Sequence, residues 1–142
     1  MYKEILLPID LNDIESQRKA VATAIGLARA FGARVHVQTI VPDFGMSLVG
    51  SYFPEGFEGK ALENASKTLH QFVRETFPED LTVQHIVAHG TVYREILRCA
   101  KEIGAELIVM ASHRPELEDY LIGPNASRVT RHADCSVLVV RD

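Results

Sequence analysis

Short apolar runs alternate with helical patterns along the whole chain, and this alternation constrains the fold more than any other feature of the sequence. The first run, Ile5-Leu6-Leu7-Pro8-Ile9, lacks the polar alternation of a strand with one solvated face. It therefore predicts a strand that is buried on both faces. Further strands are predicted at residues 35–41, 81–88, 107–111 and 137–140.

Four amphipathic helices are predicted between these strands, because apolar residues recur there every three or four positions. They cover residues 16–31, 60–77, 92–103 and about 125–133. Strict alternation of strands and helices predicts an α/β fold with a parallel sheet. We expect a single doubly wound domain over residues 1–142, with a five-stranded parallel sheet in the order 3-2-1-4-5 and helices on both faces.

The composition argues against several classes of protein. Fifteen Lys and Arg against nineteen Asp and Glu give a net charge of −4, whereas nucleic-acid-binding domains usually carry a basic face. No apolar run approaches the roughly 18 residues of a membrane span, and residues 1–4 do not resemble a secretory signal. The two cysteines, Cys99 and Cys135, lie far apart in the sequence, and we expect both to be free thiols packed in the core. We expect a cytoplasmic protein that binds no nucleic acid and is not an integral membrane protein.

A ligand site is predicted where the sheet reverses its strand order. In open α/β sheets ligands bind beyond the carboxyl ends of the strands at that point, here between the first and fourth strands. Residues 8–11 form one predicted wall, where Asp10 suits the hydroxyls of a ribose or the edge of a base. Residues 111–114 and 123–127 form the other, where Arg114 and the N–H groups of a helix start suit phosphates. The pattern predicts a nucleotide site.

Three stretches of the chain resemble the universal stress protein family. Residues 3–10, with the sequence KEILLPID, resemble the family's opening strand. The run LIVMASHR at residues 107–114, Gly123 and the run HADCSVLVVR at residues 132–141 resemble its closing third. The likeness extends from end to end, and the C-terminal half is its more specific part.

This resemblance implies a doubly wound fold and, in one branch of the family, the binding of an adenine nucleotide. The expected ligand is ATP, ADP or AMP, with Mg²⁺ as an accompanying ion. The resemblance also implies homodimers that form through the last strand, from Val137 to Val140. We therefore expect a regulatory stress-response homodimer rather than an enzyme, acting on a protein partner that the sequence does not identify.

The resemblance further implies that Asp10 contacts the adenosine, and that the backbone of Ile40 and Val41 contacts the base. The family's phosphate pattern is Gly, two residues, Gly, nine residues, then Gly and Ser or Thr. Here Ala111 and Arg114 take the first two glycine positions, the spacer has eight residues, and Pro124 follows Gly123. Pro124 lacks both the hydroxyl and the N–H that a phosphate uses. The predicted binding residues are Pro8, Asp10, Leu11, Ile40, Val41, Met110, Ala111, Ser112, His113, Arg114, Gly123, Pro124, Asn125, Ala126 and Ser127.

Two other functions stay open on the sequence alone. The first is an interaction module of the same fold without a nucleotide, in which Pro124 marks a lost site. The second is a slow ATPase, although nothing sets a base beside an oriented water and no G-x-S-x-G motif is present.

Other residues with catalytic or metal-binding chemistry are interpreted as structural or solvated. Residues 45–51 imitate the glycine spacing of a phosphate loop but lack its lysine. His85 and His89 are four residues apart on a predicted strand, where that spacing does not converge on a metal ion. Glu116, Glu118 and Asp119 suit Mg²⁺ near a phosphate tail, but a solvated acidic loop is the preferred interpretation.

Overall fold

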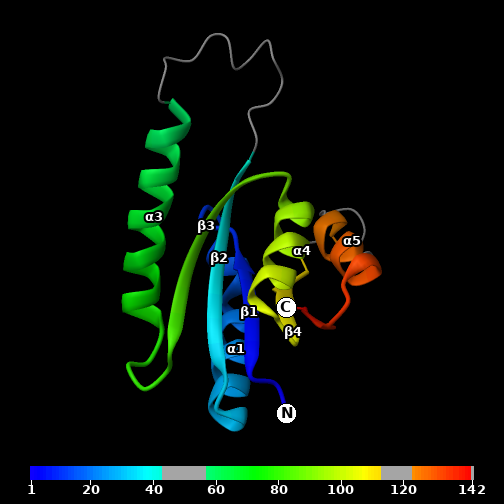
Figure 1. Ribbon diagram of the computed structural model, residues 1–142. Helices are drawn as coiled ribbons and strands as arrows, with labels where there is room; N and C mark the ends of the chain where they lie inside the picture. The colour runs from blue at the N-terminus through cyan, green and yellow to red at the C-terminus, as the bar shows by residue number, and fades with distance from the viewer. Residues whose placement is uncertain (43–56, 113–122, 142) are drawn as a thin grey trace.

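Five parallel strands form one sheet in the order β3-β2-β1-β4-β5, as the sequence predicts (Figure 1). The computed structural model describes residues 1–42, 57–112 and 123–141. The strands are β1 Glu4–Ile9, β2 Arg34–Pro42, β3 Val83–Gly90, β4 Leu107–Ala111 and β5 Ser136–Val140. The predicted α/β fold class and strand order are therefore confirmed.

The helices lie close to their predicted positions. They are α1 Arg18–Phe31, α3 Phe57–Thr76, α4 Val92–Ile103 and α5 Pro124–His132. The start of the first predicted helix is instead a 3-10 turn, η1 Glu15–Gln17, and α3 begins three residues before the predicted residue 60. Within the described residues, no helix combines the length and the apolar character that crossing a membrane requires.

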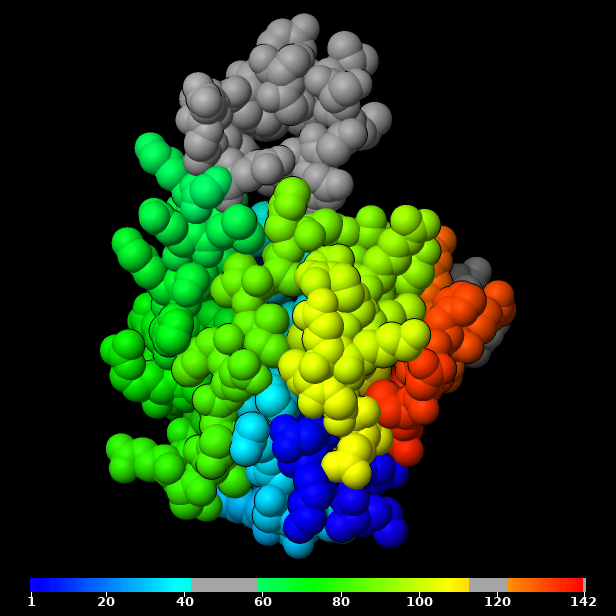
Figure 2. Space-filling view, viewed as in Figure 1, coloured from blue at the N-terminus to red at the C-terminus, as the bar shows by residue number. Residues whose placement is uncertain are grey.

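Side chains of β1 alternate between two separate cores, which explains why the strand is apolar without interruption. Ile5, Leu7 and Ile9 pack in one core with α1 and α3, whereas Leu6 packs in the other with α4 and α5. In Figure 1, α4 lies in front of the sheet and α1 lies behind it. Figure 2 shows the α4 and α5 face, where the two helices (yellow and orange) lie side by side. Helices thus cover both faces of the sheet.

The sheet is joined least extensively where its strand order reverses. The ladder between β1 and β2 runs from Glu4 to Ile9, but the ladder between β1 and β4 pairs only Ile5 with Leu107 and Leu6 with Ile108. Pro8 follows, and it has no N–H to donate to a ladder. The pairing of β1 therefore ends at Leu6 on the side of β4 but continues to Ile9 on the side of β2. Beyond Leu6, the ends of β1 and β4 border an open cleft.

Candidate functional site

A cleft of about 340 Å³ lies at the carboxyl ends of β1 and β4, the place where the fold predicts a ligand. This volume is at the lower end of the roughly 300–1,000 Å³ typical of ligand pockets. Apolar side chains form much of its surface, namely Pro8, Ile9, Ile40, Val92, Ile96, Met110 and Ala111. Polar groups are concentrated on two opposite walls. The cleft therefore suits a ligand with a flat apolar part and polar ends.

One wall is the loop that follows β1, and it carries two carboxylates. Asp10 and Asp13 line the cleft together with Asn12, Ser16 and Gln17. The Asn12 N–H donates to Asp10 Oδ1 over 2.9 Å, and the Ser16 hydroxyl donates to Asp13 Oδ2 over 2.7 Å. These bonds hold both carboxylates in defined positions. The wall accepts hydrogen bonds, so it suits hydroxyl and amino groups rather than phosphates.

The opposite wall is the beginning of α5, where Gly123, Pro124, Asn125 and Ala126 line the cleft. Gly123 is the N-cap residue and offers no capping side chain, and Pro124 stands at the first helical position. The N–H groups of the next residues in the first turn thus have no intrahelical acceptor. Together with the helix dipole, they make this end of the cleft favourable for negative charge.

Ser112, the residue that follows β4, has an unusual hydroxyl. Its side chain is 6 % exposed, and its hydroxyl has no hydrogen-bond partner among the described residues. Along β4 it falls on the same face as Met110, which lines the cleft. A buried hydroxyl without a partner costs about 1–3 kcal/mol, so such a group is a candidate for a bond to a bound ligand.

The structure brings most of the predicted binding residues together in this cleft. Those that line it are Pro8, Asp10, Ile40, Met110, Ala111, Gly123, Pro124, Asn125 and Ala126. Four described residues of the predicted set do not line it: Leu11, Val41, Ser112 and Ser127. Leu11 packs against the core of α1 and α3, and Ser127 is exposed on α5. His113 and Arg114 lie outside the described residues.

Besides the predicted wall of residues 8–11, which includes Ile9, six residues that line the cleft were missed by sequence reasoning: Asn12, Asp13, Ser16, Gln17, Val92 and Ile96. Val92 and Ile96 belong to α4, which reaches the cleft only through its packing on the sheet. Gln17 had a signal, because it is a polar residue on a helical face that continues with the buried Val21, Ala24 and Ala28. The positions of Asn12, Asp13 and Ser16 in the cleft depend on how the loop after β1 folds, and no spacing pattern in the sequence marks them.

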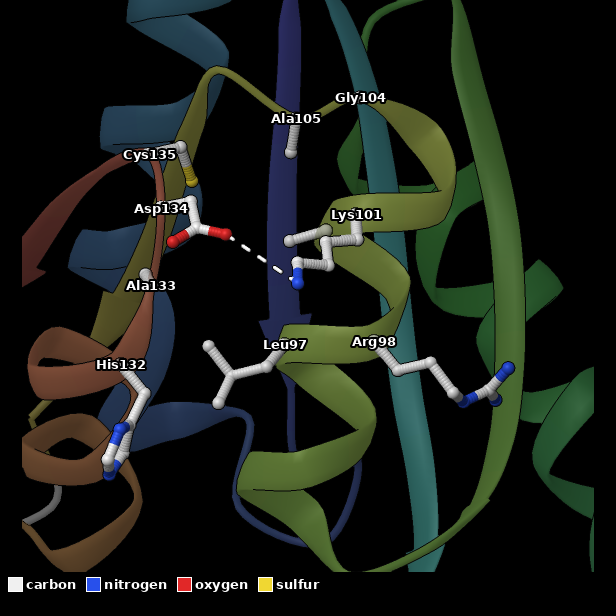
Figure 3. A pocket seen from close by; sticks show the side chains of 10 residues that line it. Leu97, Arg98, Lys101, Gly104, Ala105, His132, Ala133, Asp134 and Cys135 are labelled. Carbon is white, nitrogen blue, oxygen red and sulfur yellow. Dashed lines mark ion pairs between the residues drawn. The ribbon is translucent and has the colours of Figure 1, made fainter.

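A second cavity, of about 470 Å³, lies between the end of α4 and the link from α5 to β5 (Figure 3). Lys101 and Asp134 point toward one another across it, with 3.8 Å between Nζ and Oδ2. It lies beside the amino end of β5, away from the carboxyl ends of the strands where parallel sheets bind ligands. This cavity is larger than the cleft, but the cleft is the better candidate site because it lies at the reversal of strand order.

The cysteines and the histidine pair lie in surroundings typical of structural rather than catalytic residues. Cys99 is buried, and burial raises the pKa of its thiol to about 11. Burial also raises the pKa of the half-buried Cys135 thiol, so both groups stay protonated at neutral pH.

His85 stacks on His70 with 3.9 Å between the ring centroids. In the described part of the chain, no group of three or more His, Cys, Asp or Glu side chains is arranged for a metal ion. Residues 45–51 and Glu116, Glu118 and Asp119 lie outside that part.

Residues 1–141 match the profile of the universal stress protein family. Universal stress protein G of Shigella flexneri is 32% identical over 143 residues, which cover 99% of this chain and 100% of that protein. Two solved structures share the fold. One, a universal stress protein in complex with cAMP, is 16% identical with a TM-score of 0.73 and covers 98% of this chain and 97% of that one. The other, a universal stress protein of Archaeoglobus fulgidus in complex with dAMP, is 20% identical with a TM-score of 0.64 and covers 97% of each chain.

Proposed function

The chain belongs to the universal stress protein family, and on this premise we propose that its cleft binds an adenine nucleotide in a regulatory, stress-response role. One observation carries the proposal. The cleft sets the Asp10 carboxylate on one wall against the uncapped beginning of α5 on the other. A nucleotide has the matching asymmetry, with hydroxyl and amino donors at one end and phosphates at the other. Two proteins of the same fold are complexes with adenine nucleotides, cAMP and dAMP.

Asp10 holds the nucleoside in this proposal. Its Oδ1 is engaged by the Asn12 N–H, and its Oδ2 has no partner among the described residues. Asp10 is also exposed, so this oxygen is available to accept from a ribose hydroxyl. Ile40, Met110 and Ile96 supply apolar surface against which a purine ring can pack.

The phosphate end in this proposal is the beginning of α5. Pro124 removes one N–H and the hydroxyl that the family pattern provides there, but the backbone of Asn125 and Ala126 still offers donors. We propose that phosphates bind despite Pro124 and with lower affinity than the family pattern would give. ATP, ADP and AMP are all candidates, with Mg²⁺ as an accompanying ion for the longer phosphate chains.

Isothermal titration of the full chain with adenosine, AMP, ADP and ATP tests this function. We expect wild-type protein to bind, and Asp10→Asn to bind roughly 10- to 100-fold more weakly, because a hydrogen bond to a charged group contributes about 1.5–3 kcal/mol. Asp80→Asn is the matched control, since Asp80 is exposed and pairs with Arg29 over 3.2 Å away from the cleft. Absence of binding by wild-type protein, or equal binding by Asp10→Asn, would contradict the proposal.

We also propose that the functional unit is a homodimer formed through β5. This strand lies at one end of the sheet, so one of its edges has no neighbour within the chain. Leu138 on this strand is 38% exposed. Among the large hydrophobic residues that the structure describes, only Met1 is more exposed. An apolar edge strand is usually covered or paired, and a second copy of β5 would pair it. A regulatory protein partner is part of the proposal and stays unidentified.

A further inference from the structure

The side chain of Gln17 is joined to the loop after β1 by three hydrogen bonds. Its Oε1 accepts from the Asp10 N–H over 2.8 Å, and its Nε2 donates to the Asp10 carbonyl over 2.8 Å. Nε2 also donates to the Asp13 carbonyl over 2.5 Å. Gln17 is only 8% exposed, so these bonds form largely away from water. The amide therefore fixes both backbone groups of Asp10 at once.

This pairing continues β1 beyond its last ladder residue. The β1 ladder to β2 ends at Ile9, and Asp10 has no strand beside it to satisfy its N–H and carbonyl. The Gln17 side-chain amide has the same donor and acceptor as a peptide group, and it takes the place of the missing strand. Because Asp10 is held at its backbone by Gln17 and at its Oδ1 by Asn12, few rotations remain for its carboxylate.

We infer that Gln17 is a positioning residue for the nucleoside: its amide holds Asp10 in the orientation in which the carboxylate receives the ligand. This inference rests on the proposed nucleotide-binding function. It adds to that function a residue that is absent from the predicted binding set and that works through Asp10. At neutral pH the Gln17 amide donates and accepts together, whereas a leucine of similar size does neither and an ionised glutamate only accepts, which makes Gln17 sensitive to substitutions of equal size. Preorganisation of this kind raises affinity because the loop loses less freedom when the ligand binds.

Adenosine binding by the full chain tests the inference, with adenosine as the probe because it carries no phosphate. We expect Gln17→Leu, which keeps the size and removes every bond, to lower the affinity at least fivefold. Gln71→Leu is the control, since Gln71 is an exposed residue of α3 that bonds only to Glu75. In a double-mutant cycle, Asp10→Asn should cost much less affinity in the Gln17→Leu background than in wild type. A merely structural role for Gln17 would leave the Asp10→Asn effect unchanged.

Gln17→Glu provides a second test that does not depend on the stability of Gln17→Leu. An ionised glutamate accepts from the Asp10 N–H but cannot donate to the carbonyls of Asp10 and Asp13. Its protonated form regains one donor, and burial raises the pH at which it protonates above the ordinary pKa of about 4.3. We expect the affinity of Gln17→Glu, relative to wild type at the same pH, to rise as the pH falls from about 8 to about 5.

The outcomes separate the two proposals. If wild-type protein binds no adenosine, AMP, ADP or ATP, the nucleotide function fails, and the role of Gln17 fails with it. If wild-type protein binds and Gln17→Leu and Gln17→Glu both match it at every pH, only the role of Gln17 is overturned. A loss of affinity in Gln17→Leu without coupling to Asp10, together with a flat relative pH profile for Gln17→Glu, also overturns it.

Discussion

Two prolines, Pro8 and Pro124, line the cleft, and neither offers a backbone N–H. Pro8 stands two residues after Leu6, the last residue of β1 that pairs with β4, and its missing N–H helps to leave the strand ends apart. Pro124 occupies the first helical position of α5, where proline suits the helix but gives nothing to an anion. Pro8 thus favours the separation of the two strand ends, and Pro124 leaves the proposed phosphate end with one N–H fewer.

Replacing Pro124 should strengthen the binding of phosphates. We expect Pro124→Ser to raise the affinity for AMP and ATP roughly 5- to 100-fold, because two hydrogen bonds of about 0.5–1.5 kcal/mol each are added. Pro124→Ala restores the N–H without the hydroxyl and should fall between wild type and Pro124→Ser. Isothermal titration measures these affinities, with adenosine as a ligand whose affinity should not change. Equal AMP affinity in all three proteins would show that this position does not meet the phosphate.

At the scale of the elements, the stacked imidazoles of His70 and His85 join α3 to the edge strand β3. Burial lowers the pKa of His85, and the neighbouring His70 lowers it further. The folded protein therefore favours the neutral ring, whereas the unfolded chain takes up the proton near the ordinary value of about 6.5. The stability that His85 contributes is fully present above that value and falls as the pH drops below it.

A pH series on His85→Gln tests this effect. We expect wild-type protein to lose free energy of unfolding between roughly pH 7.5 and pH 5, and His85→Gln to lose less over the same range. Urea unfolding at each pH gives these free energies. His132→Gln is the control, because His132 is exposed on α5. If the His85→Gln and wild-type curves run parallel, proton uptake at this pair does not affect the stability of α3 on the sheet.

The sequence predicted most helices and strands well, because the residues that mark their ends and their buried faces lie within the elements or directly beside them. Gly32 and Gly104 end α1 and α4 with left-handed φ values of 63° and 66°, and an uninterrupted apolar run marks β1. The start of α3 at Phe57 rather than at residue 60 has no comparable local signal. Asp10, Ile40 and Gly123 were placed in the cleft by the topology and by the family resemblance. Val92 and Gln17 were not, because their positions depend on how α4 and the loop after β1 pack.

At the scale of the whole molecule, β3 and β5 are the two edges of the sheet, and they are protected differently. The β3 edge lies beside α3, whereas β5 carries an exposed leucine and is the proposed dimer contact. The sequence predicted an apolar last strand, but its exposure depends on its place in the sheet order. The dimer itself stays a prediction.

A charge on β5 should separate the proposed dimer. We expect Leu138→Lys to be monomeric in solution, because a lysine on an edge strand opposes pairing with a second strand. Leu138→Val keeps the apolar edge and should stay dimeric. Light scattering after size exclusion distinguishes the two states, and circular dichroism checks that each variant is folded. A dimeric Leu138→Lys protein would show that the copies meet through another surface.

The short ladder between β1 and β4 has a mechanical consequence. β1, β2 and β3 form one well-paired group, and β4 and β5 form another. Within the sheet, the two groups are joined by the short ladder Ile5–Leu107 and Leu6–Ile108 and by the hydrogen bond from the Glu106 N–H to the Glu4 carbonyl. Under a pulling force applied across the sheet, β1 and β4 should separate first, because the fewest hydrogen bonds join them. Residues of both groups line the cleft, among them Ile9 and Met110, so a ligand bound there would raise the force needed to part them.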